Sequence, residues 1–217
     1  PADNSQSPLG IGGIVLCGGK SSRMGTPKCS LPFGPELMLP RVIRILSTVV
    51  SPIIIVAAPE QELPSLVSDR NPFVDVRIVR DQFPHLGPLN GMLHGLTALP
   101  AEIDAAYISS CDVPLLKPEF IRAMIAFLGD HDLTIPQEGK FFHPLAGVYR
   151  KTLVPKIREL IASDRMRPLF LVEESHSRSV SVSELTIVDP ELESLKNINT
   201  PADYEAALAA AGFSEIS

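Results

Sequence analysis

The sequence predicts an α/β fold, a three-layer α/β/α Rossmann-like domain whose central sheet is mixed but mostly parallel. Three observations lead to this prediction. Short apolar runs, typical of strands buried on both faces, alternate with segments of helical periodicity from residue 11 to about residue 128. This alternation indicates parallel strands that are joined by helical crossovers. Further along, two strand-like runs around Gly139 indicate a hairpin, and therefore one antiparallel strand in the sheet.

The first half of the chain is expected to supply four strands with helices between them. The predicted strands are the apolar runs at residues 11–17, 52–57, 76–79 and 105–109. The helix after the first strand has its apolar residues on one face, at Leu39, Val42, Ile43 and Leu46. A weaker helix is predicted at residues 61–67, and Pro88 begins a helix that extends to about Leu99. Residues 120–128 form another helix with a clear apolar face.

The second half is expected to contribute the hairpin, three helices and one further strand. The hairpin strands lie at residues 133–135 and 142–149, helices at 153–161 and 166–172, and a strand within 179–182. The last helix has a strong start signal, with Thr200 as N-cap, Pro201 at the first position and Asp203 in the first turn. Its inner face consists of Tyr204, Ala207, Leu208 and Ala211.

The composition is that of a globular enzyme. Hydrophobic residues make up 45% and charged residues 20% of 217 residues, which is enough chain to bury a core. We expect residues 1–10 to be a flexible N-terminal segment and residues 11–217 to form a single domain, because no linker or repeat divides them. The formal net charge of -6 argues against nonspecific nucleic-acid binding, which depends on neutralising phosphates. Anionic small substrates remain compatible, because a local basic cleft can outweigh the net charge.

The cysteines and the apolar runs indicate the cellular compartment. Cys17, Cys29 and Cys111 are odd in number and have no CxxC spacing, which argues against a disulfide framework and a structural zinc site. A reducing compartment fits this pattern. Residues 1–9 lack the basic start and apolar region of a signal peptide, and no apolar run approaches the roughly 18 residues of a membrane helix. We therefore expect a cytoplasmic protein without a membrane partner.

Three loops are the first candidates for a binding site. In open α/β sheets, ligands bind at the carboxyl ends of the strands, which here are followed by residues 17–28, 80–91 and 111–114. The first loop contains three glycines, which let the backbone approach a phosphate chain closely. Its basic residues could neutralise a triphosphate, at Lys20, Arg23 and Lys28. Neither GxxxxGK[ST] nor GxGxxG is present, and a Gly-rich turn with solvated cations is the alternative interpretation.

The second loop joins a strand to a helix. Gly87 and Gly91 flank the helix start, where backbone N–H groups could bind an anion or a base edge. The alternative is a plain turn with Pro88 at the first helical position. His85 is interpreted as a surface residue of this loop rather than as a catalytic base.

The third loop carries a candidate metal ligand. Asp112 stands at the end of a strand and is held by the turn at Pro114. Mg²⁺ prefers oxygen ligands and takes only one or two protein carboxylates beside substrate phosphates. The alternative is that Asp112 only caps the helix that follows. Cys111 has no apparent partner histidine and is interpreted as structural rather than nucleophilic.

These loops carry a family resemblance. The pattern L-x-G-G-x-S-x-R-M-G-x-x-K resembles the signature of the MobA-like nucleotidyltransferases, which transfer nucleotides to the molybdenum cofactor. The matching residues are Leu16, Gly18, Gly19, Ser21, Arg23, Met24, Gly25 and Lys28. Three further segments resemble the family's C-D-x-P, HPxxAxY and N-x-N-T-P motifs, at residues 111–114, 143–149 and 197–201. The resemblance covers about residues 11–210 and implies a fold of the nucleotide-diphospho-sugar-transferase type.

The resemblance implies a nucleotide site and its metal. It assigns catalysis to Lys28, Arg23 and Asp112, with Asp112 as the Mg²⁺ ligand. It implies nucleotide binding by Leu16, Cys17, Gly18, Gly19, Lys28, Asp81, Gly87, Pro88, Leu89, Gly91 and Asp112. The Gly-Gly pair and the GPLxG segment favour guanine, and hence GTP. The sequence departs from common family residues at Cys17 and Asn90, each an alanine in many members, and at Pro27, which is often aspartate.

The resemblance also implies an acceptor and a reaction. Acceptor binding is expected at His143, Arg165, Asn197 and Asn199, with Arg167 as the next choice after Arg165. The competing interpretations are a hydrogen-bonded strand histidine, a solvated arginine pair and a simple helix start. The implied reaction moves GMP from GTP to molybdopterin that carries molybdenum and releases pyrophosphate. CTP, another phosphorylated acceptor such as a sugar phosphate, or a non-catalytic cofactor carrier are the alternatives. Transient protein contacts are expected with molybdoenzymes or cofactor-synthesis proteins.

Overall fold

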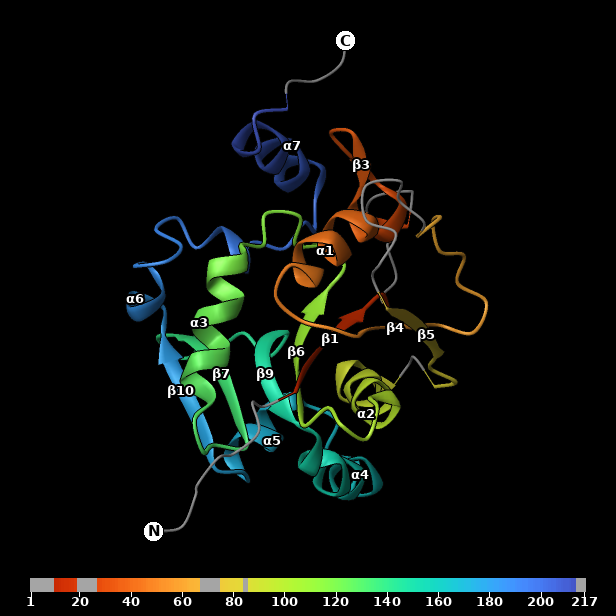
Figure 1. Cartoon of the computed structure of the whole chain (residues 1–217), viewed down its shortest axis with the longest axis vertical. Helices are drawn as coiled ribbons and strands as arrows, with labels where there is room; N and C mark the ends of the chain where they lie inside the picture. Colours follow the sequence, from red (N-terminus) through yellow and green to blue (C-terminus); the bar gives the residue numbers. More distant parts are fainter. Residues whose placement is uncertain (1–9, 19–26, 67–74, 84–85, 214–217) are drawn as a thin grey trace.

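A mixed sheet lies at the centre of the protein (Figure 1), whose computed structural model describes residues 10–18, 27–66, 75–83 and 86–213. The described strands join in the order β10-β7-β9-β6-β1-β4-β5, with β8 paired to β7 outside this path. Their bounds are β1 (Ile11–Leu16), β4 (Ile53–Ala57), β5 (Val76–Arg80), β6 (Ala105–Ser110), β7 (Leu133–Glu138), β8 (Phe141–Phe142), β9 (Ala146–Arg150) and β10 (Ser177–Ser181).

The register of the sheet sets where its loops emerge. Strand β1 is parallel to both neighbours, and Leu16 lies level with Val56 of β4 and Ser110 of β6. The loops after these three strands therefore leave from one edge. Strand β9 runs antiparallel to both β6 and β7, as the hairpin pattern predicted. The single strand predicted at residues 142–149 is divided into β8 and β9, and β8 is also antiparallel to β7.

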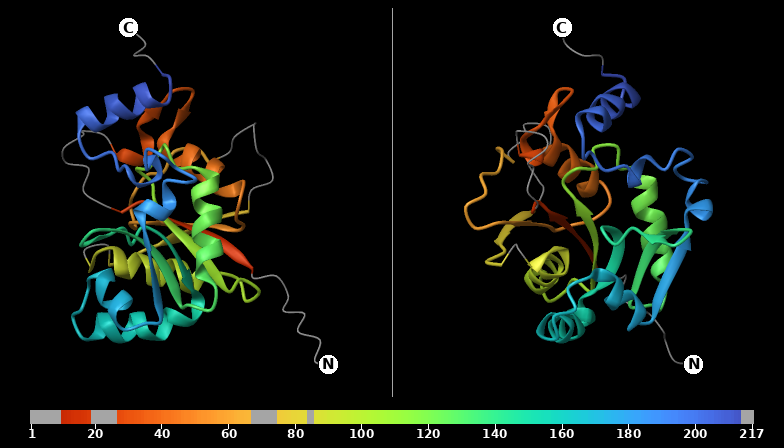
Figure 2. Two further views of the ribbon diagram at one scale, coloured as in Figure 1. Left: turned by 90° about the vertical axis from the view of Figure 1, so that its left-hand side faces the viewer. Right: turned by 180° about the vertical axis from the view of Figure 1, so that it is seen from behind.

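Helices cover both faces of the sheet (Figures 1 and 2). The helices are α1 (Met38–Ser47), α2 (Pro88–Ala98), α3 (Pro118–Leu128), α4 (Val154–Ala162), α5 (Pro168–Glu173), α6 (Val182–Leu185) and α7 (Pro201–Ala210). The apolar faces of α1 and α3 share one core cluster with the sheet, while α2, α4 and α5 share another. The prediction of a three-layer α/β/α fold with a mostly parallel sheet is confirmed.

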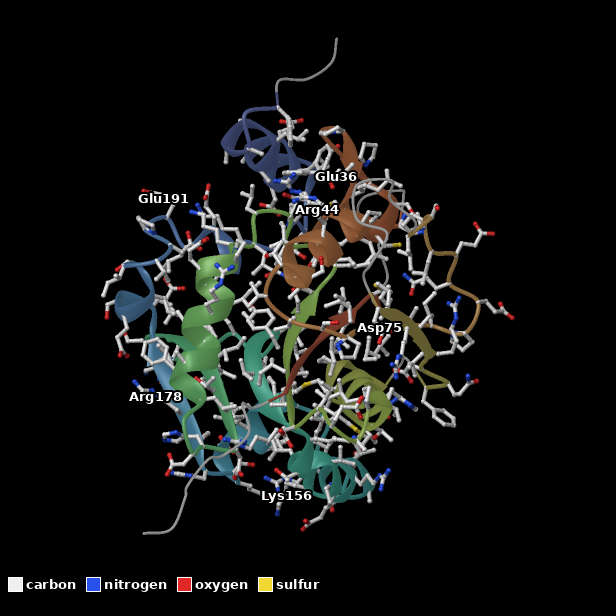
Figure 3. All side chains as sticks on the ribbon, viewed as in Figure 1. Glu36, Arg44, Asp75, Lys156, Arg178 and Glu191 are labelled. Carbon is white, nitrogen blue, oxygen red and sulfur yellow. The ribbon has the colours of Figure 1, made fainter. Side chains whose placement is uncertain are left out.

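A smaller third cluster ties the C-terminal helix α7 to the hairpin of β2 (Pro32–Phe33) and β3 (Glu36–Leu37). Phe33 and Phe213 pack edge to face, and the Arg41 guanidinium lies 4.9 Å from the Phe33 ring. Glu36 accepts a hydrogen bond from Arg44 Nε at 2.7 Å, and Figure 3 shows the two side chains together near α1. These contacts hold the end of the chain against the body of the domain. They matter for the site because α7 begins beside it.

The start of α7 follows the sequence prediction. Thr200 Oγ1 accepts a hydrogen bond from Asp203 N at 3.2 Å, and Asp203 Oδ2 accepts one from Thr200 N at 2.8 Å. This reciprocal arrangement satisfies two backbone N–H groups that have no partner within the helix. Ala207 on the predicted inner face is buried in the third cluster.

Two further expected elements differ from the structure. The predicted helix at 61–67 is absent over residues 61–66, and residue 67 lies outside the described ranges. Pro64 has no N–H to donate within a helix, and the Gln61 side chain is used elsewhere: its Nε2 donates to the Cys17 carbonyl at 2.9 Å. Strand β10 ends at Ser181, one residue earlier than expected, because Ser181 is the N-cap of α6.

Other expectations concern the termini, the cysteines and membranes. The segment expected to be flexible comprises residues 1–10, of which residues 1–9 lie outside the described part of the chain. Cys17, Cys29 and Cys111 are buried, and none of them forms a disulfide. None of the described helices is long and apolar enough to cross a membrane.

Candidate active site

Five polar side chains from three segments of the chain meet at the carboxyl ends of β1 and β6. We call Lys28, Ser110, Asp112, Asn197 and Asn199 the Asp112 cluster. Lys28 Nζ donates to Asp112 Oδ2 at 2.7 Å and to Asn199 Oδ1 at 2.8 Å. Asn197 Nδ2 donates to Asp112 Oδ1 at 2.8 Å, and Ser110 Oγ donates to the same oxygen at 2.5 Å. The structure thus brings together four of the residues that the sequence selected, and adds Ser110.

Main-chain contacts fix the loops that carry these side chains. The Asp112 carbonyl accepts a hydrogen bond from Ile198 N at 2.9 Å, which joins the third loop to the segment before α7. Arg41 Nε donates to the Pro114 carbonyl at 2.7 Å, so α1 holds the turn that follows Asp112. Lys28 begins a short 3-10 helix, Lys28–Ser30, that is anchored by the buried Cys29. Each functional group is therefore held by a packed element rather than by a free loop tip.

Asp112 is only 8% exposed, so its carboxylate depends on the donors around it. An unpaired buried carboxylate would be strongly unfavourable, whereas Asp112 accepts hydrogen bonds from a lysine, a serine and an asparagine. The alternative role of capping the next helix does not apply, because the N-cap of α3 is Lys117 and α3 has no side-chain cap. The burial and the donor set are compatible with the predicted functional role of this carboxylate.

Asn199 combines two tasks. Its backbone N–H donates to Asp203 Oδ2 at 2.9 Å, as part of the start of α7, while its side chain accepts from Lys28. The backbone hydrogen bond from Asn199, with further ones from Thr200, lowers the pKa of the Asp203 carboxyl below its ordinary value. The helix start and the Asp112 cluster are therefore connected through one residue.

A cavity of about 280 Å³ opens beside the Asp112 cluster, close to the lower limit of about 300 Å³ for typical ligand sites. Its lining residues are Leu16, Gly18, Val56, Ala57, Ala58, Asp81, Gly87, Pro88, Gly91, Ser110 and Leu145. Six of these, at positions 16, 18, 81, 87, 88 and 91, are residues for which nucleotide binding was predicted. Ser110 belongs both to the cavity wall and to the Asp112 cluster, so the two are continuous.

Asp81 supplies the one carboxylate in this lining. It is 5% exposed, and its Oδ1 accepts hydrogen bonds from Asn90 Nδ2 at 2.6 Å and from Phe83 N at 2.8 Å. His94 Nε2 lies 3.6 Å from the same oxygen. A buried acceptor in an otherwise largely apolar cavity can select a ligand that offers N–H groups.

Two glycines in the lining have backbone reasons to be glycine. Gly87 is the N-cap of α2 with φ of +80° and ψ of −171°, a conformation that is accessible essentially only to glycine. At Gly91, an added Cβ would lie 3.3 Å from the Leu16 side chain, so α2 approaches β1 closely there. Both allow backbone to form the cavity wall without side chains filling the space.

Two described residues that were predicted to bind nucleotide belong neither to the cavity lining nor to the Asp112 cluster. Leu89 is fully buried in the core between α2 and the sheet. The Cys17 side chain is buried on the opposite side of the sheet, where a hydrogen bond with Cys111 and burial raise the pKa of its thiol. Cys17 contributes to this region only through its backbone. Gly19, Lys20, Arg23 and His85 lie outside the described residues.

His143 and Arg165 are not in contact with the Asp112 cluster. His143 lies between β8 and β9, two residues from the cavity-lining Leu145, with Nε2 3.7 Å from Glu138 Oε2. Burial lowers the pKa of His143, against the opposing effect of Glu138. Arg165 pairs with Glu174 and lies 4.3 Å from the Phe170 ring. Acceptor binding by these two residues stays a prediction.

The donor set around Asp112 is compatible with Mg²⁺. Within the described ranges, no group of three or more His, Cys, Asp and Glu side chains could hold a metal ion. A group of three or more such ligands is typical of a metal that is held by the protein alone. Mg²⁺ instead needs one or two protein carboxylates and completes its coordination shell with water and substrate phosphates. Asp112, a single carboxylate that Ser110 Oγ and Asn197 Nδ2 orient, matches this second type.

Several participants were not recognised in the sequence. Ser110 is part of an apolar strand, and its only signal is that it stands two residues before Asp112. Leu145 and the Val56–Ala58 segment reach the cavity because of strand register, which the sequence does not reveal. Asn90 departs from the common family residue in the sequence, but its hydrogen bond to Asp81 is evident only in the structure.

A largely apolar cavity beside a lysine–carboxylate cluster, at the carboxyl edge of a mostly parallel sheet, defines a nucleotide-binding α/β enzyme. The family of the MobA-like NTP transferase domain matches residues 13–179 of the sequence. The chain therefore belongs to the MobA-like NTP transferase family, and the predicted family resemblance is confirmed.

Relatives match over nearly the whole chain. Two are named probable molybdenum cofactor guanylyltransferase. The protein of Mycobacterium avium (strain 104) is 36% identical over 202 residues, which are 90% of this chain and 94% of the relative. The protein of Carboxydothermus hydrogenoformans is 31% identical over 194 residues, 89% and 93% of the two chains.

Solved structures share the fold. Molybdopterin-guanine dinucleotide biosynthesis protein A from Archaeoglobus fulgidus aligns with a TM-score of 0.75 at 20% identity, covering 94% of this chain and 99% of that one. A Mycobacterium tuberculosis protein solved in complex with manganese aligns with a TM-score of 0.61 at 14% identity, covering 93% and 98%.

Proposed function

We propose that this nucleotidyltransferase moves GMP from GTP to molybdopterin that carries molybdenum, giving the guanine dinucleotide form of the cofactor and pyrophosphate. The observation that carries the proposal is the continuity at Ser110, which lines the cavity and donates to Asp112. A base held in the cavity would place its phosphates toward Lys28 and Asp112. The names of the two relatives support the same activity.

Asp81 accounts for the choice of base. Guanine presents two adjacent donors on its pairing edge, N1–H and the 2-amino group, which a carboxylate can accept. Adenine and cytosine each present a ring nitrogen that is an acceptor at the corresponding position, and this would face the carboxylate without a proton between them. A polar group left unpaired in a buried site costs binding, so the mismatch favours GTP over ATP and CTP.

The reaction needs charge neutralisation and alignment more than covalent help. The terminal phosphate of the acceptor attacks the α-phosphorus of GTP, a new phosphorus–oxygen bond forms, and pyrophosphate leaves with the electrons of the broken bond. A phosphate monoester is already largely ionised at neutral pH, so no general base is required. Lys28 would bind the phosphate oxygens as negative charge moves onto pyrophosphate. Arg23 is proposed to assist.

Asp112 would hold Mg²⁺ together with the substrate phosphates, and the ion would supply neutralisation of phosphate charge. In the structure, Lys28 already lies on one Asp112 oxygen, while Asn197 and Ser110 orient the other. These contacts keep the carboxylate in a fixed orientation.

The acceptor side of the proposal rests on fewer contacts. Asn197 and Asn199 belong to the Asp112 cluster, where an acceptor phosphate would have to arrive. His143 and Arg165 are proposed to contact the acceptor farther out. The substrates are small molecules, and contacts with molybdoenzymes or cofactor-synthesis proteins would be transient. The proposal places the enzyme in the cytoplasm and treats residues 11–217 as a single domain.

Pyrophosphate release tests the proposal. The assay contains Mg²⁺, molybdopterin loaded with molybdenum, and each of the four nucleoside triphosphates in turn. We expect release with GTP alone. Release with CTP would overturn the assignment of the base. No release with any triphosphate would overturn the proposed acceptor and favour another phosphorylated acceptor or a non-catalytic carrier.

A variant pair tests the metal ligand. Asp112→Asn keeps the shape of the side chain but removes its charge, so we expect turnover to fall by about 100-fold or more. Asp130→Asn is the matched control, because this carboxylate is 89% exposed and follows Gly129, the C-cap of α3. Equal turnover of Asp112→Asn and the wild-type protein would show that the carboxylate does not hold the ion.

A further inference from the structure

The Asp81 carboxylate has an unequal arrangement of partners. Asn90 Nδ2 and Phe83 N both donate to Oδ1, at 2.6 and 2.8 Å, and His94 Nε2 also faces Oδ1. Asp81 lines the cavity, yet none of these contacts from the described residues goes to Oδ2. One oxygen is therefore held by the protein, and the other is available to a ligand.

We propose that Asn90 is a positioning residue that fixes the Asp81 carboxylate and thereby strengthens the selectivity of this chain for guanine. The inference rests on the proposed function, because it assumes that a base occupies the cavity. Asn90 is 4% exposed and is not part of the cavity lining, so it acts through Asp81 rather than by touching the base.

The need for such a residue follows from the carboxylate itself. The last torsion of an aspartate side chain is broad, so a carboxylate with one partner can turn through a wide range. Phe83 N alone fixes the position of Oδ1 but not the plane of the group. The second donor comes from the first turn of α2, which is packed against the sheet. With both donors bound to Oδ1, the carboxylate plane is fixed relative to α2, and so is the direction of Oδ2.

The direction of the Asn90 amide is determined. Nδ2 lies 2.6 Å from a carboxylate oxygen and 3.4 Å from the Phe83 carbonyl, both of which are acceptors. The reversed amide would place its own oxygen against these acceptors, so only the donating orientation is stable. Asn90 therefore supplies a donor at this point, which an alanine cannot do.

The consequence for specificity can be measured with inosine triphosphate. Its base keeps N1–H but lacks the 2-amino group of guanine. When the Asp81 carboxylate is fixed, Oδ2 can accept hydrogen bonds from both N1–H and the 2-amino group of guanine. A carboxylate that rotates would keep only one of these two hydrogen bonds on average. Replacing Asn90 should therefore weaken the binding of GTP more than the binding of inosine triphosphate. The preference for GTP, expressed as the ratio of the two dissociation constants, should fall.

The experiment uses Asn90→Ala, Asn90→Asp and the control Thr97→Ala, an exposed position on the same helix. Dissociation constants for GTP and inosine triphosphate are measured by calorimetry, and KM and kcat by pyrophosphate release. For Asn90→Ala we expect Kd and KM for GTP to rise about tenfold, which is the value of one hydrogen bond to a charged group, with kcat within about twofold. Asn90→Asp should weaken GTP binding more than Asn90→Ala does, because two carboxylates would then face each other. Thr97→Ala should match the wild-type protein.

The outcomes separate the two proposals. One outcome is that the wild-type protein prefers GTP and that Asn90→Ala has the same ratio of dissociation constants for GTP and inosine triphosphate. This result would overturn the positioning role and leave guanylyl transfer standing. A lowered melting temperature with an unchanged ratio would show that Asn90 is only structural. A wild-type protein that binds all triphosphates equally would overturn the proposed function, and the role of Asn90 with it.

Discussion

The hydrogen bond between Asn199 and Lys28 offers a direct test of how the active site is held. Asn199 Oδ1 accepts from Lys28 Nζ at 2.8 Å, while the side chain itself is exposed and the backbone is tied to Asp203. Asn199→Ala removes the acceptor and leaves the start of α7 intact. We expect the Lys28 ammonium to spend less time in the position where it can bind the triphosphate.

The magnitude follows from the exposure of the pair. A hydrogen bond to a charged group at a partly solvated site contributes about 1 kcal/mol, which corresponds to a fall in kcat/KM of about fivefold. Stability should change little, by no more than about 0.5 kcal/mol, because an exposed side chain without packing is removed. The melting temperature should then stay within about 2 °C of the wild-type value.

Thr200→Ala is the matched control, one residue further along. It removes the N-cap acceptor for Asp203 N but does not touch Lys28. The loss of a cap costs about 1 kcal/mol, so the melting temperature should fall by about 2–4 °C. Its kcat/KM at 25 °C should stay within about twofold of the wild-type value. Pyrophosphate release and thermal unfolding measure both variants. Unchanged kcat/KM in Asn199→Ala, or equal loss of stability in both, would refute the reasoning.

Three further predictions concern other parts of the structure. Gly87→Ala introduces a side chain at φ of +80°, so we expect a loss of about 1–3 kcal/mol in unfolding free energy and weaker GTP binding by calorimetry. Gly147→Ala places a Cβ 2.4 Å from the Thr134 carbonyl oxygen in the sheet, and urea unfolding should show a loss of at least about 2 kcal/mol. Burial lowers the pKa of His143, so the unfolded chain binds more protons below pH 6.5. Stability should be full above that pH and fall as pH drops through the folded-state pKa. His143→Gln should flatten this dependence, and an unchanged slope would exclude His143 as its source.

Most of the fold could be predicted because its strands are unambiguous. The run at β4, for example, is four consecutive β-branched residues that end at Ala57, and each of them is buried. A segment this apolar and this short fits a central strand of a parallel sheet. The prediction of a helix at residues 61–66 failed because the apolar pattern there is weak and the Gln61 side chain has a long-range partner. Gln61 bonds to Cys17, which is 44 positions away, and no local rule predicts that contact.

The sequence predicted where the site lies better than it predicted which side chains contact each other there. The rule that parallel strands end at one edge brought residues 18, 81 and 112 to the same region without knowledge of the register. The partner of each side chain depends on distances of a few ångströms between elements. Asn90 illustrates this limit: its donor capacity was visible in the sequence, but its use by Asp81 depends on how α2 is placed against β5.

The N-x-N spacing before α7 shows how a short motif becomes a geometry. In an extended segment, alternate side chains point to opposite sides, so residues 197 and 199 share one side and residue 198 faces the other. Ile198 is fully buried in the third core cluster, and its N–H bonds to the Asp112 carbonyl. With the central residue anchored, Asn197 reaches the Asp112 carboxylate and Asn199 reaches Lys28. The burial of one apolar residue thus orients two amides toward the same ion pair. A substitution that weakens this anchor, such as Ile198→Ala, should disturb both contacts together.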